Sequence, residues 1–179
     1  SDSSDNDEVI NYNKTNTDDL NNTEIIEMDF EIYLPQSNDY FQLKKLLASF
    51  YKNIKMNNME NFSIECANHL SEQVECGGVL KGDAKSTPLG ILSIINWNNN
   101  NTWFLPYKQW ILKQVKKNNV DFYNFLNDKS NKIGLLFNIR MINVPYQLAQ
   151  PLHYSLIQDI QWTQDENVKD KEQYQFDYL

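Results

Sequence analysis

The chain has little of the material from which catalytic or metal sites are built. Its 179 residues include two cysteines, two histidines, five glycines, five prolines and a single arginine. Cys66 and Cys76 form no CxxC pair, and together with His69 and His153 they do not match the spacing of a zinc site. We therefore expect two free, buried thiols, no metal and no disulfide.

Long apolar runs are also missing, and no stretch approaches the roughly 20 residues that a membrane-spanning helix needs. The chain has no GxSxG elbow and no phosphate-binding GKS or GKT loop. Gly77 and Gly78 open a predicted strand rather than a helix, so they lack the geometry for cradling phosphate. These absences predict a protein that binds no membrane, uses no cofactor and catalyses no reaction.

Acidic charge is concentrated at the N-terminus. Residues 1–30 hold nine acidic residues and one lysine, so they carry the whole net charge of −8, while the rest of the chain is neutral. Residues 1–27 are rich in Asp, Asn, Ser and Thr, and their composition predicts a disordered acidic arm. The residues of this arm that we expect to contact a partner are Asp2, Asp5, Asp7, Glu8, Asp18 and Asp19.

Such an arm attracts basic proteins at long range and repels the phosphates of nucleic acids. We therefore expect a basic protein partner, no direct contact with nucleic acid, and a monomeric chain. A tail that serves solubility alone explains the same composition equally well.

Residues 28–179 predict one folded domain in which strands and helices alternate. In the first strand, apolar residues from Met28 to Leu34 occupy one face. Pro151, inside the last helix, predicts a kink or the true start of that helix. We expect strands over 28–35, 76–81, 89–97, 133–139 and 173–179, and helices over about 39–53, 58–70, 106–118, 120–128 and 144–162. This order predicts an α/β domain with a mixed central sheet flanked by helices.

Three further positions bear on function. Trp103 follows a polar loop, and we expect its ring to be partly exposed as a partner contact. Arg140, the only arginine, follows a buried strand, and we expect it to bind backbone carbonyls or a carboxylate at the sheet edge. Cys66 and His69 could be a thiol with its base, but Cys66 lies on the apolar side of its helix, which favours a structural role.

The stretch 133-IGLLFNIRMINVPYQLAQPLHYSLIQDI-160 resembles the BCCIP family. The motif is a GLL strand, an arginine, an INVP turn and a helix with a second proline, and it includes Gly134, Arg140, Asn143, Pro145 and Pro151. The segments MDFEIYLPQSNDYFQLKKLL and LGILSIIN are similar to the family's first strand and helix and to its central strand. The resemblance covers about residues 28–162, and the motif residues are expected to be structural.

The resemblance implies a fold similar to the GNAT acetyltransferases without their activity, and a family domain that continues beyond this chain at its C-terminus. It implies a nuclear protein that shuttles to the cytoplasm and escorts a basic client, such as a large-subunit ribosomal protein, in ribosome biogenesis and nuclear export. An adaptor in cell-cycle control and DNA repair is the alternative. An acetyl-CoA-dependent N-acetyltransferase is less well supported, because no glycine-rich turn enters a helix.

Overall fold

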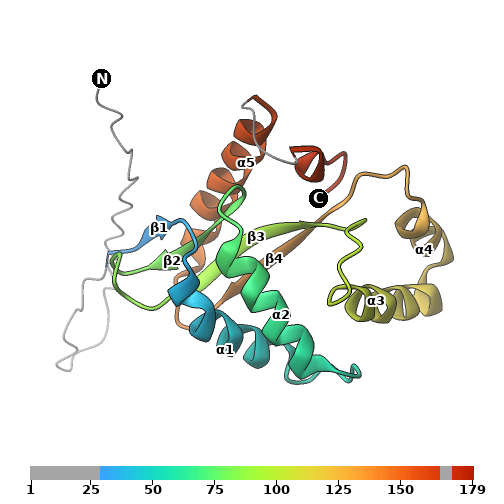
Figure 1. Ribbon diagram of the computed structural model, residues 1–179, viewed down its shortest axis with the longest axis horizontal. Helices are drawn as coiled ribbons and strands as arrows, with labels where there is room; N and C mark the ends of the chain where they lie inside the picture. The colour runs from blue at the N-terminus through green and yellow to red at the C-terminus, as the bar shows by residue number, and fades with distance from the viewer. Residues whose placement is uncertain (1–28, 166–170) are drawn as a thin grey trace, which may run out of the picture.

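The computed structural model describes residues 29–165 and 171–179 and forms a sheet between helical layers (Figure 1). The strands are β1 (Glu31–Tyr33), β2 (Gly77–Lys81), β3 (Gly90–Asn96) and β4 (Gly134–Arg140). The helices are α1 (Tyr40–Tyr51), α2 (Met59–Glu72), α3 (Leu105–Asn118), α4 (Val120–Asn127) and α5 (Ala149–Asp165). Short 3₁₀ helices occupy Ser37–Asp39, Tyr146–Leu148 and Lys171–Tyr174. The prediction of an α/β domain is confirmed.

The four strands follow the order β1-β2-β3-β4, and each pairs with its neighbour in antiparallel fashion. The prediction of a mixed sheet is therefore wrong for the described strands. Strands β2 and β3 form a hairpin through residues 82–89, whereas α1 and α2 separate β1 from β2 and α3 and α4 separate β3 from β4. Each pair of helices returns the chain to the end of the sheet that it left, so that the next strand runs antiparallel. The single parallel contact is an isolated bridge between Ile133 and Tyr178 at the start of β4.

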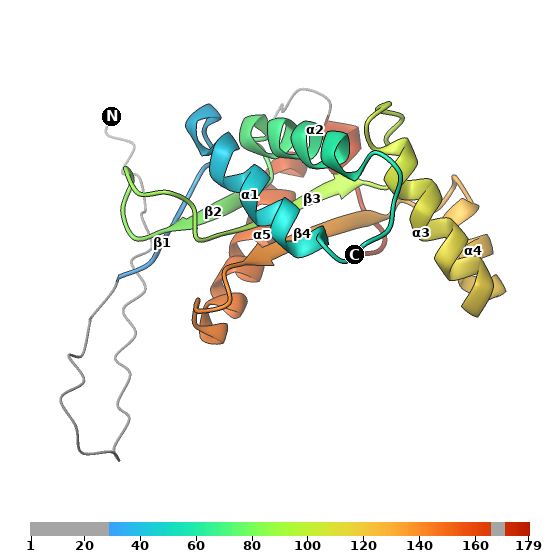
Figure 2. The same ribbon diagram turned by 90° about the horizontal axis from the view of Figure 1, so that it is seen from below.

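The two faces of the sheet carry different helices. Helices α1 and α2 cover one face and α5 covers the other (Figure 2). Strand β3 lies between β2 and β4, and its side chains alternate between these layers, with Ile91 and Ile95 toward α1 and α2 and Leu92 and Ile94 toward α5. Strand β3 is therefore buried on both faces.

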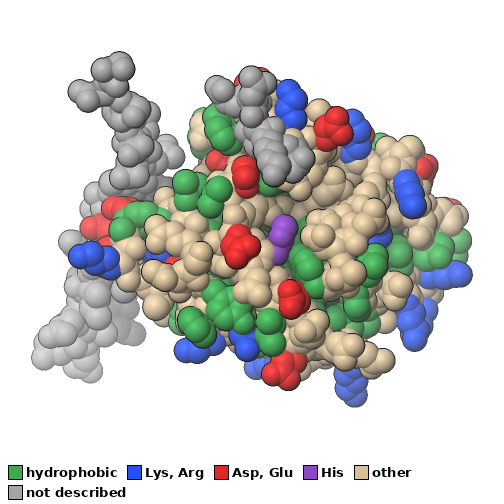
Figure 3. Space-filling model, in the orientation of Figure 1, with side chains coloured by type: hydrophobic (Ala, Val, Ile, Leu, Met, Phe, Trp, Pro, Cys, Tyr) green, Lys and Arg blue, Asp and Glu red, His purple; other side chains and the backbone are tan. Residues whose placement is uncertain are grey.

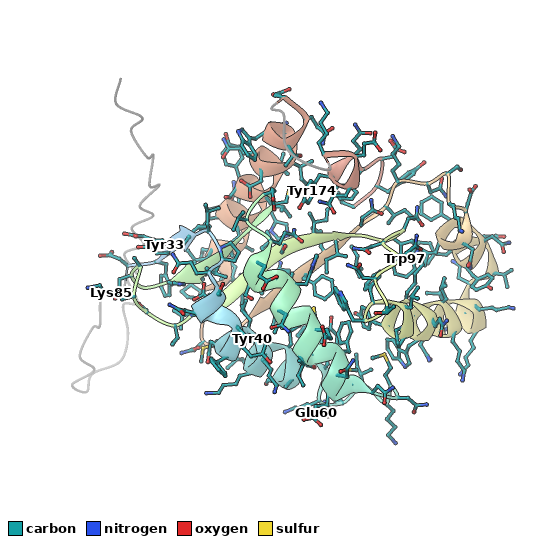
Figure 4. All side chains as sticks on the ribbon, in the orientation of Figure 1. Tyr33, Tyr40, Glu60, Lys85, Trp97 and Tyr174 are labelled. Atoms are coloured by element: carbon teal, nitrogen blue, oxygen red, sulfur yellow. The ribbon has the colours of Figure 1, made fainter. Side chains whose placement is uncertain are left out.

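Helices α3 and α4 extend the layer beyond the end of β3. Trp97 is buried between the sheet and this pair (Figure 4), and its indole Nε1–H donates to the Leu126 carbonyl at 2.8 Å. The Lys108 ammonium donates to the Trp97 carbonyl at 2.7 Å and lies 5.0 Å from the Trp97 ring centre. These contacts fix α3 and α4 against the core.

The last predicted strand is wrong. Residues 173–179 form the end of a 3₁₀ helix and a bend, and Tyr178 makes one isolated bridge, to Ile133 just before β4. Alternation of Tyr174, Phe176 and Tyr178 suggested a strand, but Tyr174 is buried against α5 and the sheet, and this packing overrides the local preference. The first strand is also shorter than expected, since it ends at Tyr33 and Leu34 is 60% exposed.

A buried ion pair ties the start of α1 to the sheet. The Lys81 ammonium lies 2.7 Å from the Asp39 carboxylate, and both side chains are almost fully buried. The second oxygen of Asp39 accepts a hydrogen bond from the Gln36 backbone at 3.0 Å, which caps the 3₁₀ helix before α1. A buried charge is costly unless it is paired, so these two residues depend on each other.

Candidate partner-binding surface

The acidic arm predicted from the sequence lies outside the described residues. This holds for all six of the residues named as partner contacts, which are Asp2, Asp5, Asp7, Glu8, Asp18 and Asp19. Their part in binding stays a prediction, and the domain prediction for residues 1–27 stays one as well.

Trp103 lies in the turn that leads into α3 and is half-buried, as the sequence indicates. Its ring packs against Phe62 at 5.9 Å and against the imidazole of His69 at 5.4 Å between ring centres. Both neighbours belong to α2, so Trp103 joins the α3 region to the surface of that helix. Burial lowers the pKa of His69, and a hydrogen bond with Gln73 partly opposes this shift. Its imidazole is therefore held in the neutral form.

Helix α2 and the residues after it form an acidic surface beside Trp103. The segment 59–75 contains Glu60, Glu65, Glu72 and Glu75 and no lysine or arginine. We call these four residues the α2 acidic face, and all of them are at least partly exposed. Figure 3 shows acidic side chains spread over α2 on this side of the molecule. The absence of basic residues from the segment is a signal that the sequence interpretation did not use.

The two thiols are structural. Cys66 and Cys76 are buried and free, as predicted. Burial raises the pKa of the Cys66 thiol and raises that of Cys76 to about 12, so neither carries a reactive thiolate near neutral pH. Beside Cys76, the Gln73 side chain donates to the Cys76 and Ile94 carbonyls at 2.8 Å and 3.0 Å. This network closes the end of α2 onto the sheet.

The motif residues that resemble the family lie in β4, in the turn that follows it and at the start of α5. A Cβ on Gly134 would come within 2.3 Å of the Ile94 side chain, so the strand pairing leaves no room there. Asn143 and Pro145 lie in the turn after β4, and Pro151 lies in the first turn of α5, so the proline marks the start of that helix. Their structural role stays a prediction, and the structure is compatible with it.

The expected partner of Arg140 is not found among the described residues. Its buried Nη1 has no hydrogen-bond partner there. The register places Arg140 opposite Gly90, and a Cβ on Gly90 would lie 2.7 Å from the Arg140 Cγ. The aliphatic stem of Arg140 thus fills the space that Gly90 leaves open, which is a packing role.

Within residues 29–165 and 171–179, no group of three or more His, Cys, Asp or Glu side chains could hold a metal ion. No helix in this part of the chain is long and apolar enough to cross a bilayer. A four-stranded antiparallel sheet with helices on both faces defines the class as an α/β domain.

The chain belongs to the BCCIP family, whose model matches residues 25–179. Protein bcp1 of Schizosaccharomyces pombe is 28% identical over 157 residues, which cover 81% of this chain and 53% of that protein. The Arabidopsis thaliana protein BCCIP homolog is 26% identical over 161 residues, which cover 87% of this chain and 48% of that protein. The chain therefore spans about half the length of the curated relatives it matches.

In animals, the human BRCA2 and CDKN1A-interacting protein is 28% identical over 154 residues and covers 76% of this chain and 48% of that protein. The crystal structure of BCP1 from Saccharomyces cerevisiae superimposes with a TM-score of 0.62 at 19% identity, over 86% of this chain and 64% of that one. This likeness supports a shared fold. The names of these relatives are those of interacting proteins rather than of enzymes.

Proposed function

We propose that this chain is part of a non-enzymatic nuclear binding protein that escorts a basic client. A large-subunit ribosomal protein is the client that the family resemblance favours, with roles in ribosome biogenesis and nuclear export. The observation that most supports this proposal is the uneven distribution of charge along the chain. Residues 1–30 hold the entire net charge of −8, and the remaining residues sum to zero. An acidic segment of this kind accelerates encounter with a basic protein.

The α2 acidic face supports the same proposal from within the folded part. Four glutamates on 59–75 have no lysine or arginine along the segment, and the half-buried Trp103 ring packs against Phe62 and His69 of the same segment. Carboxylates attract lysine and arginine side chains, and an indole ring binds such cations over its face. The surface therefore offers the chemistry for a basic segment that the arm has brought close.

An adaptor in cell-cycle and DNA-repair assemblies is the second candidate. It is favoured by the name of the human relative, which describes that protein as interacting with BRCA2 and CDKN1A. The two proposals differ in the client and share the same binding chemistry.

An acetyltransferase is less well supported. Gly77, Gly78 and Gly134 all lie in strands β2 and β4 rather than at a helix N-terminus. The backbone N–H of Gly77 donates to Asp159 and that of Gly134 donates to the Tyr178 carbonyl, so neither is available to a phosphate. The GNAT-like fold that the resemblance implies stays a prediction.

Replacing the arm carboxylates tests the proposal. In a variant in which Asp2, Asp5, Asp7, Glu8, Asp18 and Asp19 become Asn or Gln, we expect affinity for a purified basic large-subunit ribosomal protein to fall about tenfold or more at low salt. Fluorescence anisotropy measures this affinity. A control variant with Ser3, Ser4, Thr15 and Thr17 replaced by Ala keeps the charge and should bind like the wild type. Equal affinity of all three proteins would contradict the proposed role of the arm.

A further inference from the structure

Helix α1 and the turn after it are as rich in basic residues as the α2 segment is in acidic ones. The segment 40–59 contains four lysines and no Asp or Glu, so its net charge is +4. These lysines are Lys44, Lys45, Lys52 and Lys55. The one ion pair among the described residues joins Lys81 to Asp39, so the lysines of this segment have no carboxylate partner there. Unpaired charges of one sign on one element attract a segment of opposite charge.

One side of α1 combines these charges with an exposed aromatic ring. Phe41 is 72% exposed, more than any other phenylalanine of the described residues. The positions three, four and eleven residues after it lie on the same side of the helix, and all three are lysines. The opposite side carries the leucines that pack in the core. We call Phe41, Lys44, Lys45 and Lys52 the α1 basic face.

The acidic arm joins the folded part beside the start of α1. Glu31, the first residue of β1, pairs with Lys81 of β2 in the sheet. The Lys81 ammonium in turn lies 2.7 Å from the carboxylate of Asp39, the residue immediately before α1. The strand that follows the arm and the first turn of α1 therefore meet at the same corner of the fold (Figure 1).

The arm is long enough to reach the whole of the α1 basic face. The twelve residues of α1 are about 18 Å long. A flexible chain of 27 residues has a root-mean-square end-to-end distance of about 30 Å. A short tether of this kind gives an effective concentration in the millimolar range. A contact that is weak between separate molecules is therefore well populated within one chain.

The arm complements the α1 basic face in charge and in apolar side chains. Residues 1–27 contain eight acidic residues and one lysine. Their apolar residues are Val9, Ile10, Tyr12, Leu20, Ile25 and Ile26. The carboxylates attract the unpaired lysines of α1, and apolar side chains that cover the Phe41 ring remove its surface from water.

Two other occupants of the α1 basic face are disfavoured. A nucleic acid would have to bind beside the attachment point of an acidic arm, which repels its phosphates. The arm of a second copy would have to compete with the arm of the same chain, whose effective concentration is far above that of a protein in dilute solution.

We propose that the α1 basic face binds the acidic arm of the same chain when no client is bound. The carboxylates of the arm pair with Lys44, Lys45 and Lys52, and its apolar side chains cover Phe41. A basic client needs the same carboxylates, so it binds by displacing the arm from α1. This competition rests on the proposed function, whereas the contact between the arm and α1 does not. The α1 basic face thereby weakens binding of sparsely charged proteins and favours clients with dense basic charge.

Paramagnetic relaxation enhancement tests the contact in the client-free chain. A nitroxide is attached to the thiol of a Ser4→Cys variant, which is selective because the native thiols of Cys66 and Cys76 are buried. At low salt we expect the amide signals of residues 40–52 to broaden. At about 500 mM NaCl, where the Debye length is about 4 Å, the broadening should disappear.

Two triple variants of equal charge separate α1 from the other basic surfaces. In the α1 triple variant, Lys44, Lys45 and Lys52 are replaced by Gln, and we expect the broadening to be lost. The control variant carries Lys113→Gln, Lys116→Gln and Lys117→Gln on α3, where all three lysines are exposed. It should keep the broadening of the wild type. Sharp α1 signals in the wild type, or an equal loss of broadening in both triple variants, would overturn the inference.

The same spectra identify other occupants. In a mixture of spin-labelled chains and unlabelled ¹⁵N-enriched chains, the α1 signals should stay sharp. Broadening in this mixture would show that the arm of a second copy is bound and would overturn the inference. So would a wild type whose α1 signals stay sharp but which binds a single-stranded oligonucleotide through the lysines of α1.

A basic large-subunit ribosomal protein tests the competition. It should sharpen the α1 signals of the spin-labelled wild type and bind the α1 triple variant about threefold more tightly, because the arm is then free in a larger fraction of molecules. Equal affinity, or broadening that persists at saturation, would contradict the competition. If α1 broadens but no ribosomal protein binds, the contact stands and the proposed function fails. If the arm is needed for binding the ribosomal protein but α1 never broadens, only this inference fails.

Discussion

At the scale of single residues, the tightest constraint in the sheet is Gly77. Its φ of +118° lies where side chains are rarely tolerated, and a Cβ there would come within 2.6 Å of the Leu92 carbonyl oxygen. The backbone N–H of Gly77 donates a hydrogen bond to the Asp159 carboxylate of α5. Gly77 thus allows β2 to start close to β3 while its amide points at α5, a combination that only glycine adopts without strain.

We predict that Gly77→Ala lowers the free energy of unfolding by at least about 2 kcal/mol, through backbone strain and overpacking. Gly82→Ala is the matched control, because a Cβ at Gly82 would meet nothing closer than 3.7 Å. Its stability should change by less than about 0.5 kcal/mol. Urea unfolding followed by circular dichroism measures both. Comparable losses in the two variants would show that the close approach at Gly77 does not constrain the sheet.

Some residue-level features were within reach of the sequence and others were not. Gly77 and Gly78 were predicted to open a strand rather than a helix, and they form the start of β2. The burial of Lys81 could not be predicted, since its partner Asp39 lies 42 positions earlier and only the fold brings the two together. The buried, unpaired Nη1 of Arg140 could not be predicted either, because the position of Arg140 opposite Gly90 depends on how β3 and β4 pair.

At the scale of elements, long periodic segments were predictable and connections between them were not. Helix α1 was predicted because apolar residues recur at helical spacing, namely Phe41, Leu43, Leu46, Leu47 and Phe50. The three leucines are buried as expected, whereas Phe41 and Phe50 are exposed. The antiparallel sheet was missed because strand direction depends on pairing partners that periodicity does not reveal. Two surface features were visible in the sequence but were not used. The segment 59–75 contains no lysine or arginine, and the segment 141–164 contains one charged residue.

Helix α5 is held to β2 by Asp159, and this contact predicts a dependence of stability on pH. Burial raises the pKa of Asp159 above its ordinary 3.8, and the hydrogen bond from Gly77 opposes this only in part. A pKa that is higher in the folded protein than in the unfolded chain favours folding when the group is protonated. The contribution of Asp159 is therefore full below about pH 3.8 and is lost as pH rises through the folded pKa.

We predict that Asp159→Asn removes the decrease in stability that ionisation of Asp159 causes as pH rises. The variant should be at least as stable as the wild type at neutral pH, because the amide oxygen still accepts the hydrogen bond from the Gly77 N–H. The measurement is urea unfolding at a series of pH values, with the exposed Asp165→Asn on the same helix as control. The difference between Asp159→Asn and the wild type should grow as pH rises above 3.8. A difference that is constant with pH would show that Asp159 is not destabilised by its burial.

At the scale of the whole molecule, charge and shape are divided between different parts of the chain. The N-terminal 30 residues carry the net charge, and the remaining residues are balanced. The folded part presents two distinct surfaces, the α1 basic face and the α2 acidic face, on helices that cover the same side of the sheet (Figure 2). In the proposed escort, the arm moves from the α1 basic face to a basic client, which the α2 acidic face helps to hold in a defined position.

The most direct test of this account is the salt dependence of client binding. Isothermal titration calorimetry of the full chain with a basic large-subunit ribosomal protein, from about 50 to about 500 mM NaCl, spans Debye lengths from about 14 to about 4 Å. We predict that the dissociation constant rises steeply over this range for the wild type and much less for the arm-neutralised variant. A dissociation constant that stays the same from low to high salt would contradict the account.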